Sequence, residues 1–351
     1  PTFLLLLLLS SSTNAFNFAS LLNPTPKTST STPPSPPEIK TPIVICPGFF
    51  NDEIDYISPL QQPPEVGFVS GLQRRGFTSI SIVNVKRSDW VRVAGGLFDI
   101  NFYRNKALPT GNGYGWYIER LKEAVDRAYE ESGGEKVMLV GHSAGGWLAR
   151  AAMGDGVWDE EGGVKTADRI RCLTTVGAIH KPPPELGSCS TRGALAYTNT
   201  EYPGAFLAEE GVTYVTVGGD AVMGYDSKKK DEVNEGREAV DEIYAVRGEG
   251  SSAKVAFDSY EIVCGEGSVT GDGVVPLEWT MLEGARHIAL EGVLHSINEA
   301  GTTVPTDRWY GSEKVLDRWL PVVLEEAGLV ENKKSGLFQG FDGFKNIFQQ
   351  N

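Results

Sequence analysis

Short apolar runs alternate with longer amphipathic stretches through the middle of the chain. The runs at residues 41–46, 79–85, 136–140, 171–176, 212–217 and 287–290 have the length and composition of strands. The first, TPIVIC, is apolar on both faces, as in a strand buried inside a parallel sheet. Helices are predicted at residues 65–75, 116–131, 146–153 and 313–327. Strands separated by helices predict an α/β fold, a mostly parallel sheet flanked by helices on both faces.

The same pattern predicts how the chain is divided. One folded domain is expected at residues 38–330, with cap or lid insertions at about 177–211 and 219–259. The second insertion is predicted from a polar, charge-dense region that lacks strand character. Residues 1–37 are interpreted as a targeting leader with a Pro/Ser/Thr-rich spacer, and residues 331–351 as a Phe-rich tail.

The leader prediction depends on the first residues of the chain. The apolar run at residues 3–9 is far shorter than the roughly 20 residues that cross a bilayer, and it is typical of a signal peptide. Asn14-Ala15-Phe16, followed by many Ser, Thr and Pro residues, resembles the two-part leader of algae with secondary plastids. A plastid location is therefore predicted, and the plain secretory route and a merely disordered arm are the alternatives.

The predicted tail carries an apolar stripe at helical spacing, formed by Leu337, Phe338, Phe341, Phe344 and Phe348. Such a stripe is compatible with peripheral contact to a membrane. Packing of the tail against the folded domain is the preferred interpretation, because apolar segments of this size are rarely left exposed.

Charge and cysteine content exclude further classes of partner. With 32 Lys and Arg against 46 Asp and Glu, the net charge is −14, so no nucleic-acid partner is expected. The four cysteines show no metal-ligand spacing, so no metal site is expected. Cys46 and Cys172 lie in apolar runs and are predicted to be buried thiols, whereas a Cys189–Cys264 bridge stays open.

One motif points to chemistry. Gly141-His142-Ser143-Ala144-Gly145 lies between a predicted strand and a predicted helix, which is the context that a nucleophile elbow requires. The bare Gly-x-Ser-x-Gly pattern is weak evidence in a chain with 41 glycines, so the prediction depends on that context. Ser143 is therefore predicted to be a catalytic nucleophile.

A serine nucleophile needs a histidine base and a carboxylate that orients it. His295 follows the last predicted strand, where this arrangement places its base, and is the candidate. Asp272, in a glycine-bracketed turn, and Asp220, which follows the strand at residues 212–217 more directly, are the candidate acids, and Asp272 is preferred because a family resemblance of the chain supports it. The order Ser143, Asp272, His295 along the chain is the order nucleophile, acid, base that serine hydrolases with a nucleophile elbow have.

The remaining site predictions concern the oxyanion and the substrate. The backbone N–H groups of Phe49 and Ala144 are expected to bind the oxyanion. Phe50, His142 and His180 are expected to line the substrate site, although His142 points away from Ser143 if the elbow forms and His180 fits a structural cap equally well. Aromatic residues crowd two connections and could form an acyl pocket or core; they are Phe98, Phe102, Tyr103, Tyr114, Trp116 and Tyr117 in one and Tyr197, Tyr202 and Phe206 in the other.

With VICPGFFN, VGHSAGGWLAR, GDGVVP and VLHS in this order, the chain resembles α/β-hydrolase-fold serine hydrolases of the lipase and esterase type. It is most similar to a plastid-associated group of plants and algae, and the resemblance extends to flanking segments such as Trp309-Tyr310-Gly311. One departure is Gly177-Ala178-Ile179-His180, where relatives tend to have Gly-Thr-Pro-His before a proline run.

The resemblance implies a carboxylic ester hydrolase that acts on small or lipid esters through an acyl-serine intermediate, without a cofactor or metal. An acyltransferase with the same triad and a non-catalytic lipid-binding protein of the same fold are the alternatives. The natural substrate, the acyl-chain length and the oligomeric state do not follow from the sequence.

Overall fold

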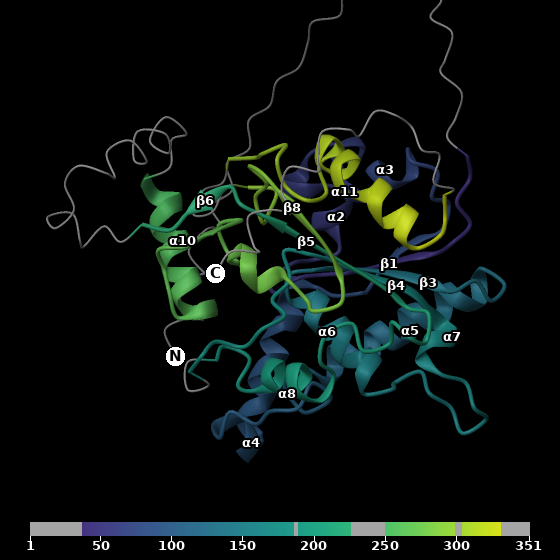
Figure 1. The fold of residues 1–351 in the computed structure, drawn as a ribbon, viewed down its shortest axis with the longest axis horizontal. Coiled ribbons are helices and arrows are strands. Elements are labelled where there is room, and N and C mark those ends of the chain that lie inside the picture. Colours follow the sequence, from purple (N-terminus) through teal and green to yellow (C-terminus); the bar gives the residue numbers. More distant parts are fainter. Residues whose placement is uncertain (1–36, 186–188, 226–249, 299–303, 331–351) are drawn as a thin grey trace, which may run out of the picture.

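The computed structural model of the chain describes residues 37–185, 189–225, 250–298 and 304–330 (Figure 1). The predictions for the leader and for the Phe-rich tail lie outside these residues. Within them, no helix is both long enough and apolar enough to cross a membrane.

Six parallel strands form the central sheet, in the order β2-β1-β3-β4-β5-β8. Their bounds are β1 Ile43–Cys46, β2 Ile80–Ile82, β3 Val137–His142, β4 Ile170–Val176, β5 Thr213–Gly219 and β8 Arg286–Leu290. Every predicted strand is present and the parallel α/β architecture is confirmed. Only β2 is much shorter than predicted, because it is an edge strand that pairs with β1 alone.

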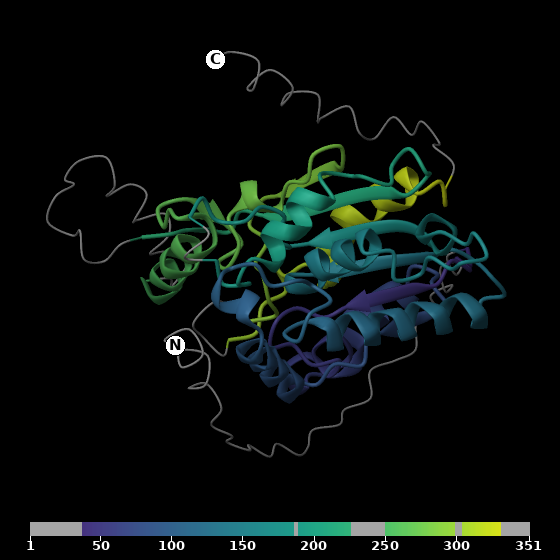
Figure 2. The same cartoon turned by 90° about the horizontal axis from the view of Figure 1, so that it is seen from below.

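Helices cover both faces of the sheet, and alternate strand residues enter two separate cores (Figures 1 and 2). Val44 and Cys46 face the layer of α5 (Gly115–Glu131), α6 (Ala144–Gly154) and α8 (Ala194–Glu201). Ile43 and Ile45 face the opposite layer. That layer contains α2 (Ile54–Ile57), α3 (Phe68–Gln73) and α11 (Glu313–Glu326). The period-2 alternation of a strand thus explains why β1 had to be apolar throughout.

The helix predicted at residues 65–75 is wrong in its first turn. The chain there forms two short 3-10 helices, η1 (Pro59–Gln61) and η2 (Pro64–Val66), and α3 begins only at Phe68. Gly67 separates η2 from α3, and a Cβ on it would lie 2.1 Å from the carbonyl oxygen of Ile57. Close backbone contact therefore sets the start of this helix.

A small unit is inserted after β5. In it β6 (Val222–Met223) pairs with β7 (Thr270–Gly271), and α10 (Gly250–Cys264) packs beside them (Figure 1). The expectation that this region lacks strands is therefore wrong at β6, and α10 crosses the predicted boundary at residue 259. The remaining short elements are η3 (Arg87–Phe98), α4 (Ile100–Tyr103), α7 (Thr166–Arg169) and η6 (Leu277–Thr280).

All four cysteines are buried and free. Cys46 and Cys172 are buried thiols as predicted, whereas the Cys189–Cys264 bridge that the sequence left open does not form.

Candidate active site

Ser143 lies at the bend between β3 and α6. Its backbone has φ 51° and ψ −125°, a strained conformation for a residue with a side chain. A Cβ on Gly145 would lie 2.1 Å from the Cys46 carbonyl oxygen, and one on Gly141 would lie 2.4 Å from the Cα of Gly146. Both glycines of the Gly-x-Ser-x-Gly pattern are therefore required by the tight packing of the bend.

The turn after β1 lies directly against Ser143. A Cβ on Gly48 would come within 2.8 Å of the Ser143 Cβ, so glycine permits this close approach. The turn is closed by the Asn51 amide, which donates to the Gly48 carbonyl over 3.0 Å. Within the described residues, neither the Phe49 amide nor the Ala144 amide donates to a protein acceptor. Two backbone donors near Ser143 thus remain available.

Asp272 and His295 form a buried pair. His295 Nδ1 lies 2.8 Å from Asp272 Oδ2, and the His295 amide donates to the Asp272 carbonyl over 2.9 Å. Asp272 Oδ1 accepts the amides of Val274 and Val275 at 3.0 and 2.8 Å. The Tyr310 hydroxyl donates to Asp272 Oδ2 over 2.8 Å. Four donors thus fix the carboxylate, which in turn fixes the imidazole.

Asp220, the alternative acid, has a different partner. Its Oδ1 accepts the amide of Gly292 over 2.8 Å. Of the two candidate acids, Asp272 is the one that contacts His295.

Ser143 and the Asp272–His295 pair both lie beside the carboxyl end of β4. The Ser143 amide donates over 3.0 Å to the carbonyl of the last β4 residue. Gly177 follows that residue, and a Cβ on it would lie 2.7 Å from Asp272 Oδ2 and 3.0 Å from His295 Nδ1. The rings of His142 and His295 lie 4.9 Å apart between centroids. The fold therefore gathers residues from β3, from the turn before η6 and from the loop after β8.

His142 links three parts of this site through its buried ring. Its Nε2 lies 2.9 Å from the His295 carbonyl oxygen, and Nε2 must be the donor because a carbonyl can only accept. In this neutral tautomer Nδ1 is the acceptor, and it accepts the Tyr56 hydroxyl at 2.9 Å. The Tyr56 hydroxyl also accepts the Gly48 amide at 3.1 Å. Burial, together with nearby His295, lowers the pKa of His142 to about 3. Because both ring nitrogens are bonded, His142 has no free polar atom for a substrate, in contrast to its predicted role.

His180 is also buried inside the fold. Its Nε2 lies 2.9 Å from Thr175 Oγ1, and its carbonyl accepts Arg150 Nη2 at 3.3 Å. Burial, with the charge of Arg150, lowers the pKa of His180 well below its ordinary value. The ring is fully shielded from solvent, which contradicts its predicted place on the surface of a substrate site.

The aromatic residues of the first crowded connection divide into two groups. Phe102, Tyr114 and Tyr117 are buried in the core that α5 and α6 share. Phe98 and Tyr103 are 90% and 63% exposed. Phe49 and Phe50 are half-buried beside Ser143, with ring centroids 4.7 Å apart. The apolar surface next to Ser143 is thus formed by the turn after β1.

Sequence reasoning missed Tyr56 and Tyr310. The contact of Tyr56 with His142 joins residues 86 positions apart, and no pattern along the chain indicates it. Tyr310 belongs to the Trp309-Tyr310-Gly311 segment, whose resemblance was the only available signal and carried no role.

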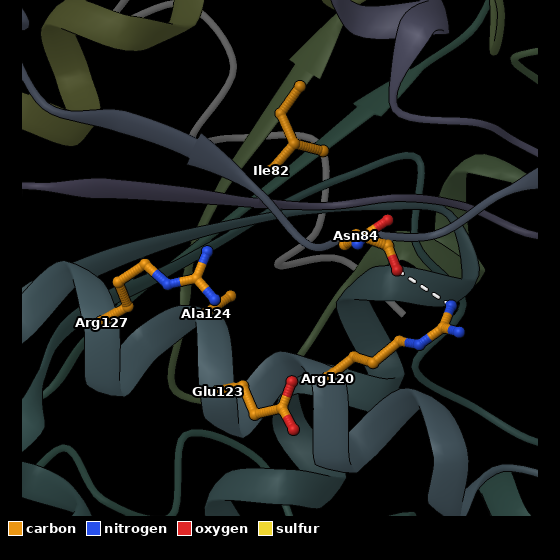
Figure 3. Close-up of a pocket in the computed structure, with 6 residues that line it drawn as sticks. All are labelled: Ile82, Asn84, Arg120, Glu123, Ala124 and Arg127. Carbon is orange, nitrogen blue, oxygen red and sulfur yellow. Dashed lines mark hydrogen bonds between the residues drawn. The ribbon is translucent and has the colours of Figure 1, made fainter.

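A separate pocket of about 120 Å³ lies between α5 and the segment of β2 (Figure 3). It is lined by Ile82, Asn84, Arg120, Glu123, Ala124 and Arg127. Arg120 is held by the Asn84 carbonyl at 2.9 Å. None of the candidate site residues lines this pocket. Among the described residues, no group of three or more His, Cys, Asp or Glu side chains could hold a metal ion.

The architecture is that of the α/β-hydrolase fold. A parallel sheet carries helices on both faces, an inner strand ends at a strained serine bend that opens a helix, and a carboxylate and a histidine follow in that order. Within this fold many chemistries occur, so the reaction has to be argued from the site itself.

No family model matches the chain, and no curated protein sequence matches it either. Solved structures are similar at low identity. The mature Bacillus licheniformis lipase BlEst2 is 14% identical, covers 84% of this chain and 94% of its own length, and gives a TM-score of 0.45. Staphylococcus hyicus lipase is 14% identical, covers 86% of this chain and 100% of its own length, and gives a TM-score of 0.43. The metagenomic carboxyl esterase MGS0156 is 14% identical, covers 87% of this chain and 82% of its own length, and gives a TM-score of 0.42.

Proposed function

We propose that this chain hydrolyses carboxylic esters, acyl lipids among them, through an acyl-serine intermediate. The observation that carries the proposal is the buried Asp272–His295 hydrogen bond of 2.8 Å beside a serine held in strained geometry. A serine hydroxyl becomes a useful nucleophile when an oriented imidazole removes its proton. A purely structural serine requires neither the imidazole nor the strain.

In the proposed reaction, His295 Nε2 takes the Ser143 proton as Oγ attacks the ester carbonyl. The resulting oxyanion accepts the free amides of Phe49 and Ala144, each such donor being worth about 3 kcal/mol. His295 then protonates the leaving alcohol, and an acyl-serine remains. Water, deprotonated by His295, attacks this ester and releases the acid and the free Ser143 hydroxyl. Asp272 holds the imidazole in one tautomer throughout, with Nδ1–H facing the carboxylate.

An apolar acyl group fits the surroundings of Ser143. The Phe49 ring packs edge-on against Phe50 and, at 5.0 Å between centroids, against the buried Trp90. Half-buried aromatic rings beside a nucleophile favour contact with an apolar substrate group over a charged one.

Labelling by a fluorophosphonate probe tests the nucleophile. The wild-type chain should be labelled, and Ser143→Ala should not. Equal labelling of the two chains would show that Ser143 is not the reactive group, and absence of labelling in the wild type would contradict the enzymatic proposal altogether.

Hydrolysis of p-nitrophenyl esters with acyl chains of two to sixteen carbons tests the proposed role of the Asp272–His295 pair. Asp272→Asn should lose on the order of 10⁴ in kcat, because the amide favours the wrong imidazole tautomer. Asp220→Asn is the matched control, with the same chemical change and no contact to His295, and should stay within a few-fold of wild type. The opposite ranking would move the acid to Asp220.

Product analysis with an added alcohol distinguishes hydrolysis, which yields free acid, from acyl transfer.

A further inference from the structure

A run of large apolar side chains is left exposed between Val91 and Leu108. It lies on η3, α4 and the residues that follow, and α4 projects at the rim of the molecule near α8 (Figure 1). We define the η3–α4 patch by its exposed members, which are Val91, Leu97, Phe98, Ile100, Tyr103 and Leu108. Single exposed apolar residues need no explanation, whereas six within one short segment indicate an interaction surface.

The backbone that presents the patch is firmly anchored. Trp90 is buried, and its Nε1 donates to the Asn51 carbonyl over 3.1 Å. Phe102 is also buried, and a Cβ on Gly96 would lie 2.3 Å from its ring. The Asp99 side chain caps α4 by accepting the Asn101 amide at 2.9 Å. Because inward residues alternate with exposed ones, the exposure of the patch belongs to the folded state.

The patch segment carries two unpaired cations in an acidic protein. Residues 86–108 contain five Lys or Arg and two Asp. Three of these cations, Lys86, Arg87 and Arg92, are paired with Glu53, Asp55 and Asp89. Asp89 is paired with Arg120, and Asp99 is occupied by the α4 cap. Arg104 and Lys106 are exposed and form no ion pair with a described residue. Basic charge interleaved with exposed apolar side chains matches an anionic lipid surface, which offers both phosphate and acyl chains.

We infer that the η3–α4 patch docks the protein on anionic lipid surfaces. Apolar side chains such as Phe98 enter the acyl boundary while Arg104 and Lys106 contact phosphate. Trp90, the neighbour of Val91 in the chain, contacts the Phe49 ring of the turn after β1. The inference concerns binding and does not require that the chain be an esterase.

A site-specific fluorophore tests the inference in the full chain. Because all four native cysteines are buried, Leu97→Cys can be labelled selectively with an environment-sensitive dye such as NBD. Glu131→Cys is the matched control, since this exposed residue ends α5, about 25 Å from the Trp116 end of the helix. Both variants carry Ser143→Ala, so binding is read without turnover. Vesicles are phosphatidylcholine alone or with about one third phosphatidylglycerol.

We expect a blue shift and a several-fold rise in emission at position 97 with phosphatidylglycerol vesicles only, and no change at position 131. Arg104→Glu with Lys106→Glu should weaken vesicle affinity about tenfold or more. Lys122→Glu with Arg127→Glu on α5 makes the same change in net charge and should have little effect.

Three results would overturn the inference. One is an unchanged signal at position 97 with either vesicle, and another is an equal shift with phosphatidylcholine alone. The third is a label that is already shielded without vesicles and becomes exposed when residues 331–351 are deleted, because the chain's own tail would then occupy the patch. The vesicle-binding measurements do not depend on catalysis, so they remain interpretable even if the ester-hydrolysis assays show no activity.

Discussion

Tyr56 and Tyr310 each place one buried hydroxyl between a backbone amide and a titratable side chain. Tyr310 accepts the Gly219 amide at 2.8 Å and donates to Asp272, while Tyr56 accepts the Gly48 amide and donates to His142. Burial raises the pKa of both phenols, so each keeps its proton and remains a donor. These hydroxyls position the site without a place in the reaction itself.

At the residue scale, Tyr310→Phe should lower kcat about tenfold with KM nearly unchanged, because Asp272 loses one of the donors that fix it. The free energy of unfolding should fall by about 1–3 kcal/mol, since the Gly219 amide loses its acceptor. Steady-state kinetics and urea unfolding measure the two effects. Tyr202→Phe removes another hydroxyl that donates to a carboxylate, that of Asp155 at 2.6 Å, and serves as the control because neither residue contacts a candidate site residue. An equal loss of kcat in both variants would contradict a specific role for Tyr310.

There is a physical reason why the sequence indicated Ser143 but did not indicate Tyr310. The bend imposes local steric demands, so small residues at fixed spacing record it in the sequence. A hydroxyl that contacts a carboxylate 38 residues away leaves no such local trace. His142 and His180 were misjudged for the same reason, because their burial and their hydrogen-bond partners follow from tertiary packing.

At the scale of elements, close backbone approach shapes the site more than helix or strand propensity does. The sheet was predictable because its strands are apolar, and α5 was predictable because its apolar residues follow the helical period. The start of α3 and the pairing of β6 with β7 were not, since a glycine contact and a two-residue pairing decide them. The turn after β1 is the clearest case, because its distance from Ser143 depends on one missing Cβ.

Gly48→Ala should therefore lower kcat/KM about 10- to 100-fold, because the added Cβ pushes the turn and the Phe49 amide away from Ser143. Gly162→Ala is the control, since a Cβ there meets no atom within 4 Å and its φ is not in the left-handed region. Ester hydrolysis by the two variants gives the comparison. Wild-type activity in Gly48→Ala would show that the turn is not part of the oxyanion site.

At the scale of the whole molecule, three histidines are held in the neutral form, the buried His142 and His180 and the half-buried His287. Burial is the main cause that lowers the pKa of His142 to about 3, of His287 to about 4, and of His180 well below its ordinary value. In the unfolded chain each titrates near 6.5, so below that pH the unfolded state binds more protons. Stability is therefore complete above about pH 6.5 and is lost as the pH falls toward the folded-state values.

Urea unfolding at pH 7 and pH 5 measures this dependence. Each buried histidine should contribute up to about 2 kcal/mol to the loss between the two pH values. His287→Gln, away from the Asp272–His295 pair, should retain correspondingly more of its stability at pH 5, because one titrating group is gone. The same pH dependence in His287→Gln and wild type would contradict the neutral state of His287 in the folded protein.

The residue before His295 packs against the small unit inserted after β5, the unit whose strand β7 directly precedes Asp272. Leu294 packs in the small core of the insertion with Val222, Ala256 and Tyr260. A chimera that exchanges this insertion for one from another protein would therefore also replace the support of the loop that carries His295. Such grafts should succeed only where the donor segment supplies an apolar contact of matching shape for Leu294, even when every residue of the active site is kept.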